Sequence, residues 1–266
     1  MGGLLRDYEL KRGRAMLHFQ AIRESIEHST NVDLKPVPGE VDRDAGKHVF
    51  HVPLKPIDPA WALLVGDFIY DTRASLDYLI TALIRSTGQE ENETSQFPIY
   101  RIEAHKLSTI DQRWEKDARC GIKGNLKGTP TGTKAALKQL QPFYGVPVVN
   151  PFRHPLYALH VLSNRDKHRR LNLLARVVSS KFVDAAGKKI FEGPPQSARI
   201  PKTHEGDAYT VTLSTRDKLD VDMYLLPTYD IRLNEPPQLV GNLIDTLAGI
   251  NEFIDTRVLP TVRALL

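Results

Sequence analysis

The chain has 266 residues, of which 41% are hydrophobic and 26% are charged, and its formal net charge is +4. These values are ordinary for a folded globular protein, and they exclude wholesale disorder and collagen-like repeats. The single cysteine, Cys120, excludes an internal disulfide bond and zinc sites built from cysteines.

The sequence predicts a cytoplasmic protein that does not enter a membrane. Its first residues lack the apolar core of a signal peptide. The most apolar window, Tyr78–Ile84, has about a third of the length needed to span a bilayer. The mildly basic charge balance is compatible with an acidic partner but does not require one.

Two long helices are predicted in the first third of the chain, from about Leu5 to His28 and from Pro59 to Ser86. Asp58 suits the N-cap of the second helix, and Gly88 suits its C-terminal stop. One face of the second helix is mostly apolar: Trp61, Val65, Phe68, Thr72, Leu76, Leu79 and Leu83. Because this stripe is unbroken, we expect the second helix to form the centre of the core.

A small β-hairpin is predicted between these two helices. Val32–Leu34 and His48–Val52 have strand-like patterns, and Asp44–Gly46 carries a turn signal. The hairpin would separate the helices without belonging to the helical core.

The second half of the chain changes from helical to strand-like periodicity. After residues 89–132, which have no clear pattern, short helices are predicted over Lys134–Gln141 and Pro155–Asn164. A last helix is expected to open at Pro236-Pro237 and to bend or end at Pro260. The predicted antiparallel strands between them start at Leu171, turn at Asp184–Gly187, and continue over Tyr209–Leu213, Leu219–Leu226 and Tyr229–Leu233.

Together these elements predict an α+β fold in one domain, residues 1–266. It is a helical bundle with a long central helix, a small N-terminal hairpin and an antiparallel β insertion before the C-terminal helix. The helical core is expected over residues 1–30, 58–88, 132–165 and 236–266, and the β-rich insertion over residues 170–234.

The first candidate site lies on the predicted central helix. Tyr70, Arg73 and Asp77 are spaced at i, i+3 and i+7, so they project to one side, and Gly66 one turn earlier would allow a close approach. An arginine flanked by a carboxylate and a tyrosine could bind a phosphate or carboxylate group. The alternative is a solvent-facing ion pair between Arg73 and Asp77, which the segment alone favours.

The second candidate site is the run Ser163–Arg170, where a helix gives way to a strand. His168 could act as a general acid or base, and Lys167 and Arg169 could hold phosphate oxygens. Asn164 and Asp166 complete the predicted ligand-binding set. The alternative is that the cations only stabilise the carbonyl groups at the helix C-terminus.

No metal ion or cofactor is expected. His48 and His51 lie three apart on a predicted strand, so they point to opposite faces and cannot share a metal ion. His18 is interpreted as a surface residue. Three aspartates could gather around a divalent cation, but nothing in their spacing defines such a site: Asp67, Asp71 and Asp166.

The two candidate sites belong to a pattern that resembles a family of bacterial proteins common in actinobacteria. The matching elements are Gly66-Asp67, Arg73–Asp77, Phe97–Ile99, Leu140–Phe143 and Leu162–Arg169. Family members often have Asn at the position of Asp71 and His at the position of Tyr78, so chemistry that needs that histidine would be altered here. The resemblance implies an architecture and carries no established activity.

A more distant similarity is to the HEPN helical ribonucleases and nucleotide-binding bundles. Their signature is an arginine, a polar residue, and then a histidine after four to six intervening positions. Arg23–His28 and Arg153–His160 have this spacing. The similarity implies a bundle of long helices with a metal-independent ribonuclease activity.

We therefore predict that the run from Asn164 to Arg169 contacts Arg73 or Asp77, because each segment alone leaves charge poorly compensated. The preferred function is binding of a nucleotide or an RNA phosphate at this cluster. A ribonuclease with His168, Arg73 and Asp77 as catalytic residues is one alternative, and a buried structural network is the other. Whether the protein is an enzyme, and whether it forms a homodimer, stays open.

Overall fold

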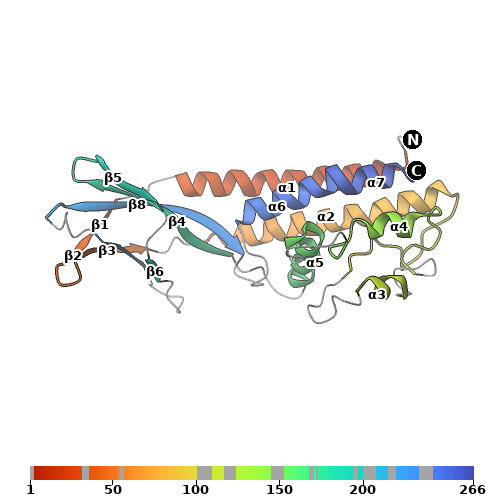
Figure 1. Ribbon diagram of the computed structural model, residues 1–266. Helices are drawn as coiled ribbons and strands as arrows, with labels where there is room; N and C mark the ends of the chain where they lie inside the picture. Colours follow the sequence, from red (N-terminus) through yellow and green to blue (C-terminus); the bar gives the residue numbers. More distant parts are fainter. Residues whose placement is uncertain are drawn as a thin grey trace. The chain divides into compact units, whose positions relative to one another are not determined.

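The structure is a computed structural model of the chain, and its elements are shown in Figure 1. It describes residues 3–31, 36–53, 57–100, 110–116, 124–144, 153–167, 171, 173–193, 197–199, 208–214, 220–233 and 242–266. The chain divides into two compact units, and each unit uses separate stretches of sequence. The helical unit comprises Met1–Arg23, Pro59–Asn172 and Leu233–Leu266, and the strand unit comprises Glu24–Asp58 and Leu173–Arg232. The predicted α+β class is confirmed.

The helices in the described residues are α1 (Arg6–Asn31), α2 (Pro59–Ser86), α3 (Ile110–Lys116), α4 (Thr133–Lys138), α5 (Pro155–Asp166), α6 (Leu243–Phe253) and α7 (Leu259–Arg263). The predicted helices are present in the predicted order, and α3 is an additional helix in a segment for which no element was predicted. Figure 1 shows α1, α2 and the α6–α7 segment running lengthwise along the helical unit. In the part of the chain that the structure describes, no helix is both long and apolar enough to cross a membrane.

Helix α2 is the centre of the helical core, as predicted. All seven residues of its predicted stripe are buried, and the ring of Phe68 lies 5.9 Å from that of Phe19 on α1. The helix begins at Pro59 and is followed by Gly88, whose positive φ of 73° suits a C-terminal stop. Its capping signals and its period agree, which is why its bounds were predictable.

The C-terminal helix is interrupted rather than simply bent. Helix α6 begins at Leu243, where the side chain of Asn242 accepts a hydrogen bond from the amide of Asp245. A π-helical turn over Ile254–Val258 then joins it to α7. Pro260 has no amide hydrogen to donate to the preceding turn, which accounts for the irregularity expected there. The expected opening at Pro236-Pro237 lies outside the described residues.

A buried arginine joins the two ends of the helical unit. The Arg12 guanidinium on α1 donates to the side chain of Asn251 at 2.6 Å and to the Asp255 carboxylate at 2.9 Å. Asp255 belongs to the π-helical turn, so this turn places a carboxylate beside α1. The contact ties α1 to α6 and to the π-helical turn that follows it.

In its described residues, the strand unit consists of two four-stranded sheets. Their orders are β1-β8-β4-β5 and β2-β3-β7-β6. The strands are β1 (Val37–Pro38), β2 (Glu40–Asp42), β3 (Lys47–Pro53), β4 (Leu173–Asp184), β5 (Lys189–Gly193), β6 (Ser197–Arg199), β7 (Ala208–Ser214) and β8 (Met223–Leu233).

The predicted N-terminal hairpin is real, but it is not a separate feature. Strands β2 and β3 pair around the predicted turn, and β3 then pairs with β7 along its whole length, from Lys47↔Ser214 to Pro53↔Ala208. The hairpin and the β insertion therefore form one unit. The predicted strand over Val32–Leu34 lies outside the described residues.

One further boundary differs from the prediction in this unit. The two strands expected over Leu219–Leu226 and Tyr229–Leu233 are a single strand, β8, that runs through Pro227. Strand β1 pairs only with Tyr224 and Leu225, so the proline falls beyond that pairing.

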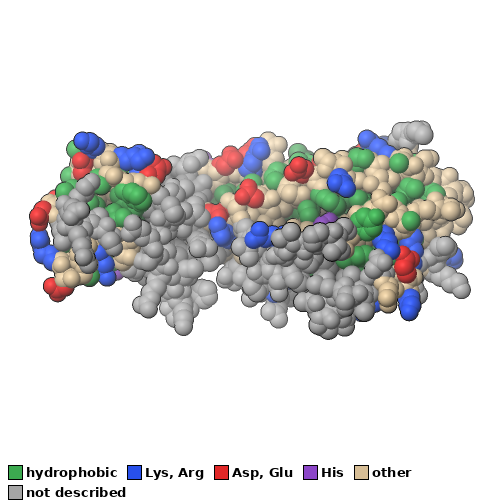
Figure 2. Space-filling view, in the orientation of Figure 1, with side chains coloured by type: hydrophobic (Ala, Val, Ile, Leu, Met, Phe, Trp, Pro, Cys, Tyr) green, Lys and Arg blue, Asp and Glu red, His purple; other side chains and the backbone are tan. Residues whose placement is uncertain are grey.

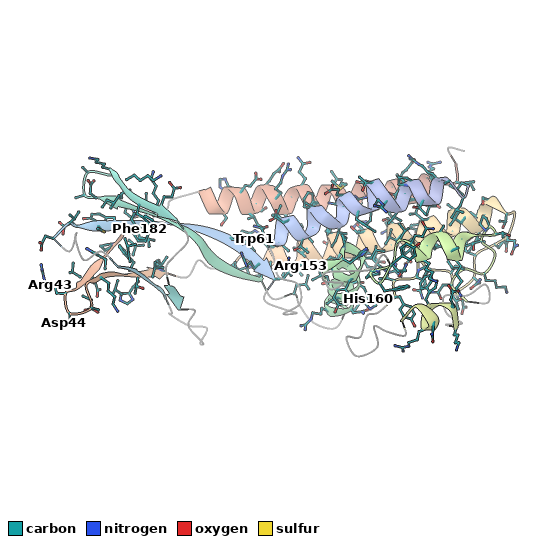
Figure 3. All side chains as sticks on the ribbon, viewed as in Figure 1. Arg43, Asp44, Trp61, Arg153, His160 and Phe182 are labelled. Atoms are coloured by element: carbon teal, nitrogen blue, oxygen red, sulfur yellow. The ribbon has the colours of Figure 1, made fainter. Side chains whose placement is uncertain are left out.

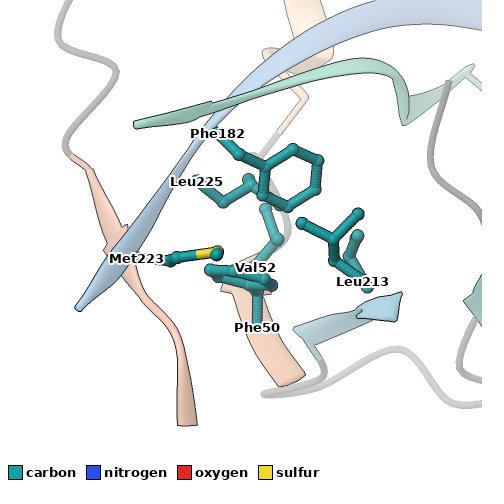
Figure 4. Packing of buried hydrophobic residues seen from close by; sticks show 7 residues of the cluster. Phe50, Val52, Phe182, Leu213, Met223 and Leu225 are labelled. Atoms are coloured by element: carbon teal, nitrogen blue, oxygen red, sulfur yellow. The ribbon is translucent and has the colours of Figure 1, made fainter. Parts of the chain in front are cut away.

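The two sheets share an apolar core. The ring of Phe50 packs at 5.1 Å from that of Phe182, and the cluster in Figure 4 consists of Phe50, Val52, Phe182, Val211, Leu213, Met223 and Leu225. His48 is buried on the same strand as Phe50, whereas His51 is exposed, which confirms that these histidines point to opposite faces.

Candidate functional site

Helix α5 carries the predicted polar run of Asn164 to Lys167, and it packs on α2. Its inner face buries Leu156, Leu159 and Leu162. The helix ends at Asp166, two residues beyond the prediction, so Asn164 and Asp166 are helical and Lys167 is the C-cap. His168 and Arg169 lie outside the described residues.

Asp166 lies directly against Gly66 of α2. A Cβ atom at position 66 would come within 2.5 Å of Asp166 Oδ1, so the absence of a side chain at Gly66 makes room for this carboxylate. Burial, and then the nearby negative charge of Asp67, raise the pKa of Asp166. The close approach expected at Gly66 is therefore made by a residue of the second candidate segment.

Arg73 and Asp77 form a clamp on the backbone of Phe97. Arg73 Nη2 donates to the carbonyl oxygen of Phe97 at 2.7 Å, and Asp77 Oδ1 accepts from the amide of Phe97 at 2.8 Å. The two side chains are 3.3 Å apart and 18% and 35% exposed, so the pair is half-buried rather than solvent-facing. Burial lowers the pKa of Arg73 and raises the pKa of Asp77. The charge of each residue shifts the pKa of the other in the opposite direction and so reduces the effect of burial.

The two predicted segments come together across the α2–α5 interface. The charge of Lys167 is close enough to Asp77 to lower the pKa of that carboxyl, against the larger effect of burial. The contact of the Asp166 carboxylate with Gly66 is the second link between the two segments. Asn164 has a different neighbour: its side-chain nitrogen lies 3.0 Å from Nε2 of His160, one turn earlier on α5.

Tyr70 does not belong to this cluster. It is exposed, and the ammonium group of Lys11 on α1 lies 5.1 Å from the centre of its ring. The helical spacing placed Tyr70 on the side of Arg73, but the two residues face different neighbours because α2 is packed by several helices at once.

Sequence reasoning missed a buried ionic cluster around Asp71. This carboxylate is only 3% exposed and lies 2.7 Å from Lys11 Nζ, 3.1 Å from Arg14 Nε and 3.6 Å from His18 Nε2. His18 is therefore not the surface residue that was expected. Lys11, Arg14 and His18 are spaced at i, i+3 and i+7 on α1, and this spacing was the available signal.

The three aspartates suggested as a cation site are divided between these two clusters. Asp67 is close to Asp166, whereas Asp71 is bound by the cations of α1. Among the residues that the structure describes, no group of three or more His, Cys, Asp or Glu side chains could hold a metal ion.

The α5 region also carries one of the two Arg–His pairs whose spacing is similar to the HEPN signature. Figure 3 labels Arg153, just before the helix, and His160, within it. Arg153 is exposed, and His160 is half-buried beside Asn164. The other spacing, Arg23–His28, lies on α1.

His154 fixes the start of α5 and provides a pH-dependent prediction. Its Nδ1 accepts from the amide of Leu156, its ring packs edge-on 4.7 Å from that of Phe253, and burial, then the charge of Arg257, lower its pKa from 6.5 to about 4. The folded state thus binds fewer protons between these values. The stability contributed by His154 is complete above pH 6.5 and falls by roughly 3 kcal/mol as the pH drops to 4.

We expect His154→Asn to remove most of this pH dependence, because asparagine can still cap the helix but does not titrate. The measurement is the free energy of unfolding in urea at several pH values from 7 to 4. Identical pH profiles for the two proteins would contradict the assigned burial of His154.

Comparison with protein-family models, curated proteins and solved structures finds no significant match for this chain. Arg73 and Lys167 can bind an anionic oxygen, and Asp77 and Asp166 can orient those cations or accept a proton.

Proposed function

We propose that the protein binds a phosphate-bearing ligand, a nucleotide or an RNA phosphate, at the α2–α5 cluster of Arg73, Asp77, Asp166 and Lys167. Arg73 pairs with Asp77 on α2, and the charge of Lys167, at the end of α5, acts on the same carboxylate. Cations at such positions bind phosphate oxygens through charge-assisted hydrogen bonds. Arg169 and His168 follow Lys167 directly in sequence and stay part of the proposed ligand-binding set.

One observation carries the proposal. Arg73 Nη2 is anchored on Phe97, but Nη1 of the same guanidinium is buried without a hydrogen-bond partner among the described residues. A buried, unpaired donor costs about 1–3 kcal/mol, and more when it is charged. An anionic oxygen brought to Nη1 would remove this cost, while the Phe97 clamp keeps the guanidinium in place.

The face of the molecule in view in Figure 2 favours local recognition over a broad electrostatic field. In Figure 2, acidic and basic side chains are interspersed over the described residues of the helical elements in view. Non-specific nucleic-acid binding usually relies on a continuous basic surface. Binding here would therefore depend on a few defined cations.

The test is titration of the full-length protein with ATP and, separately, with a short fluorescent single-stranded RNA. We expect Lys167→Ala to weaken binding about fivefold, the effect of about 1 kcal/mol. For RNA, the slope of the logarithm of the binding constant against the logarithm of the salt concentration should also decrease in magnitude by about one. Lys127→Ala is the matched control, because Lys127 is an exposed lysine in a turn outside the cluster and should leave binding unchanged.

Three outcomes are informative. No binding of either probe at low salt would overturn the proposal. Binding that Lys127→Ala weakens as much as Lys167→Ala would place the ligand elsewhere. Cleavage of the RNA in the presence of EDTA, abolished by His168→Ala, would support the ribonuclease alternative.

A structural role is the second candidate, and the Phe97 clamp favours it. Both backbone polar groups of Phe97 are satisfied by α2, through Arg73 and Asp77. In this case Asp77→Asn would lower the melting temperature without changing the affinity for any ligand. A loss of affinity in a protein with an unchanged melting temperature would favour binding.

A further inference from the structure

Helices α1 and α2 leave four large apolar side chains in solvent. Leu10 and Leu17 on α1, and Leu63 and Tyr70 on α2, are each more than 60% exposed. Within each pair the spacing is seven residues, which is two helical turns and places both members on one side of their helix. Each helix thus presents a short apolar ridge.

The two ridges border one surface. The ammonium group of Lys11, next to Leu10, lies over the ring of Tyr70, and Arg14 reaches Asp71, next to Tyr70. Leu10 and Tyr78 also line the same hollow of about 270 Å³, together with Asp7, Lys11 and Arg14. The α1–α2 face is defined here as Leu10, Arg14, Leu17, Leu63, Asp67 and Tyr70.

The α1 side of this face carries a cation, and the α2 side carries an anion. Arg14 lies four residues after Leu10 and three before Leu17. Asp67 lies four residues after Leu63 and three before Tyr70. Both charged residues are exposed. The face therefore carries the same apolar–charge–apolar pattern twice, with a cation on α1 and an anion on α2.

We propose that the α1–α2 face binds the same face of a second copy of this chain. In a two-fold arrangement with α1 of each copy on α2 of the other, Arg14 meets the partner's Asp67, and the same pair forms again by symmetry. The four apolar side chains of each copy are then covered, as in a four-helix bundle. A foreign helix would need to supply this pattern, whereas the chain already contains both halves of it.

The occupant is assigned by this charge complementarity, and the inference does not depend on the proposed ligand. Opposite charges at matched positions fix the register and orientation of a helical interface. The apolar ridges supply most of the affinity, since they remove large side chains from water.

Sedimentation equilibrium of the full chain over a range of concentrations tests the proposal. We expect a dimer for the wild type and a dissociation constant raised about 100-fold or more by Leu17→Glu, which places two buried charges in each dimer. Asp67→Lys should weaken the dimer about tenfold at low salt, because the introduced lysine would face the partner's Arg14 and the two cations repel each other. High salt should reduce that effect by screening the repulsion.

Met16→Glu is the matched control. Met16 is a neighbouring exposed residue of α1 outside the α1–α2 face, so this change should leave the dimer intact. Circular dichroism should show an unchanged melting temperature for the Leu17→Glu monomer, since Leu17 is exposed in the single chain. A wild type that stays monomeric at high concentration, or a dimer that resists Leu17→Glu, would overturn the proposal.

Discussion

Replacing Leu76 with alanine is expected to lower the free energy of unfolding by about 2–5 kcal/mol. Leu76 is 0% exposed in the middle of α2, the helix with the longest buried stripe among the described residues. The change removes apolar contacts and leaves a cavity that the surrounding helices can close only in part. Chemical denaturation monitored by circular dichroism measures the effect.

Leu76→Met is the control at the same position. Methionine has a similar volume and a flexible side chain, so it should cost less than about 1.5 kcal/mol. A Leu76→Ala protein that melts within a degree of the wild type would show that this part of α2 does not form the core.

Removing both cations that contact Asp71 should be more damaging than removing Asp71 itself. In the double variant Lys11→Met, Arg14→Met the carboxylate stays buried, and of its described ionic neighbours it keeps only His18. An uncompensated buried charge costs about 3–5 kcal/mol, and we expect the low end of this range because Arg14 is largely exposed and its contribution is screened.

Asp71→Asn gives the comparison. It removes the buried charge, and Lys11 and Arg14 can then turn toward water, so the expected cost is about 1 kcal/mol. The urea unfolding of both proteins should be measured at the same low protein concentration. Arg14 also belongs to the α1–α2 face, and the proposed dimer should not contribute to the comparison. Equal losses of stability would show that the burial of the Asp71 charge does not determine the energetics of this cluster.

The fold was predictable wherever local signals were sufficient. The sequence of α2 carries an N-cap signal at Asp58, a proline in the first turn, a stop glycine and a continuous period, and the bounds of the helix match the prediction. The joining of the N-terminal hairpin to the β insertion was not predictable. It depends on pairing between β3 and β7, which are more than 150 residues apart, and strand periodicity does not identify a partner.

Part of the candidate site was also predictable from local signals. The opposite charges of Lys167 and Asp77 indicated that the two segments meet, and Gly66 indicated a close approach, which Asp166 makes. The Asp71 cluster was missed because its members lie on helices about 60 residues apart, and only packing brings them together. The signature shared with HEPN proteins stays a prediction, since two residues at a loose spacing define no geometry.

The long-range pairing of β3 with β7 also determines which pieces of the chain can be self-sufficient. Joining these strands closes a loop that contains most of the helical unit, at an entropic cost of roughly 4–5 kcal/mol for a flexible chain of this length. Folding of the intervening helices shortens the free loop and reduces that cost. A fragment cut at Leu173 and Arg232 would keep β7 but lose β3, and with it Phe50 and Val52 of the shared core. The strand unit is therefore compact in space but discontinuous in sequence, and it needs residues from both sides of the interruption to complete its core.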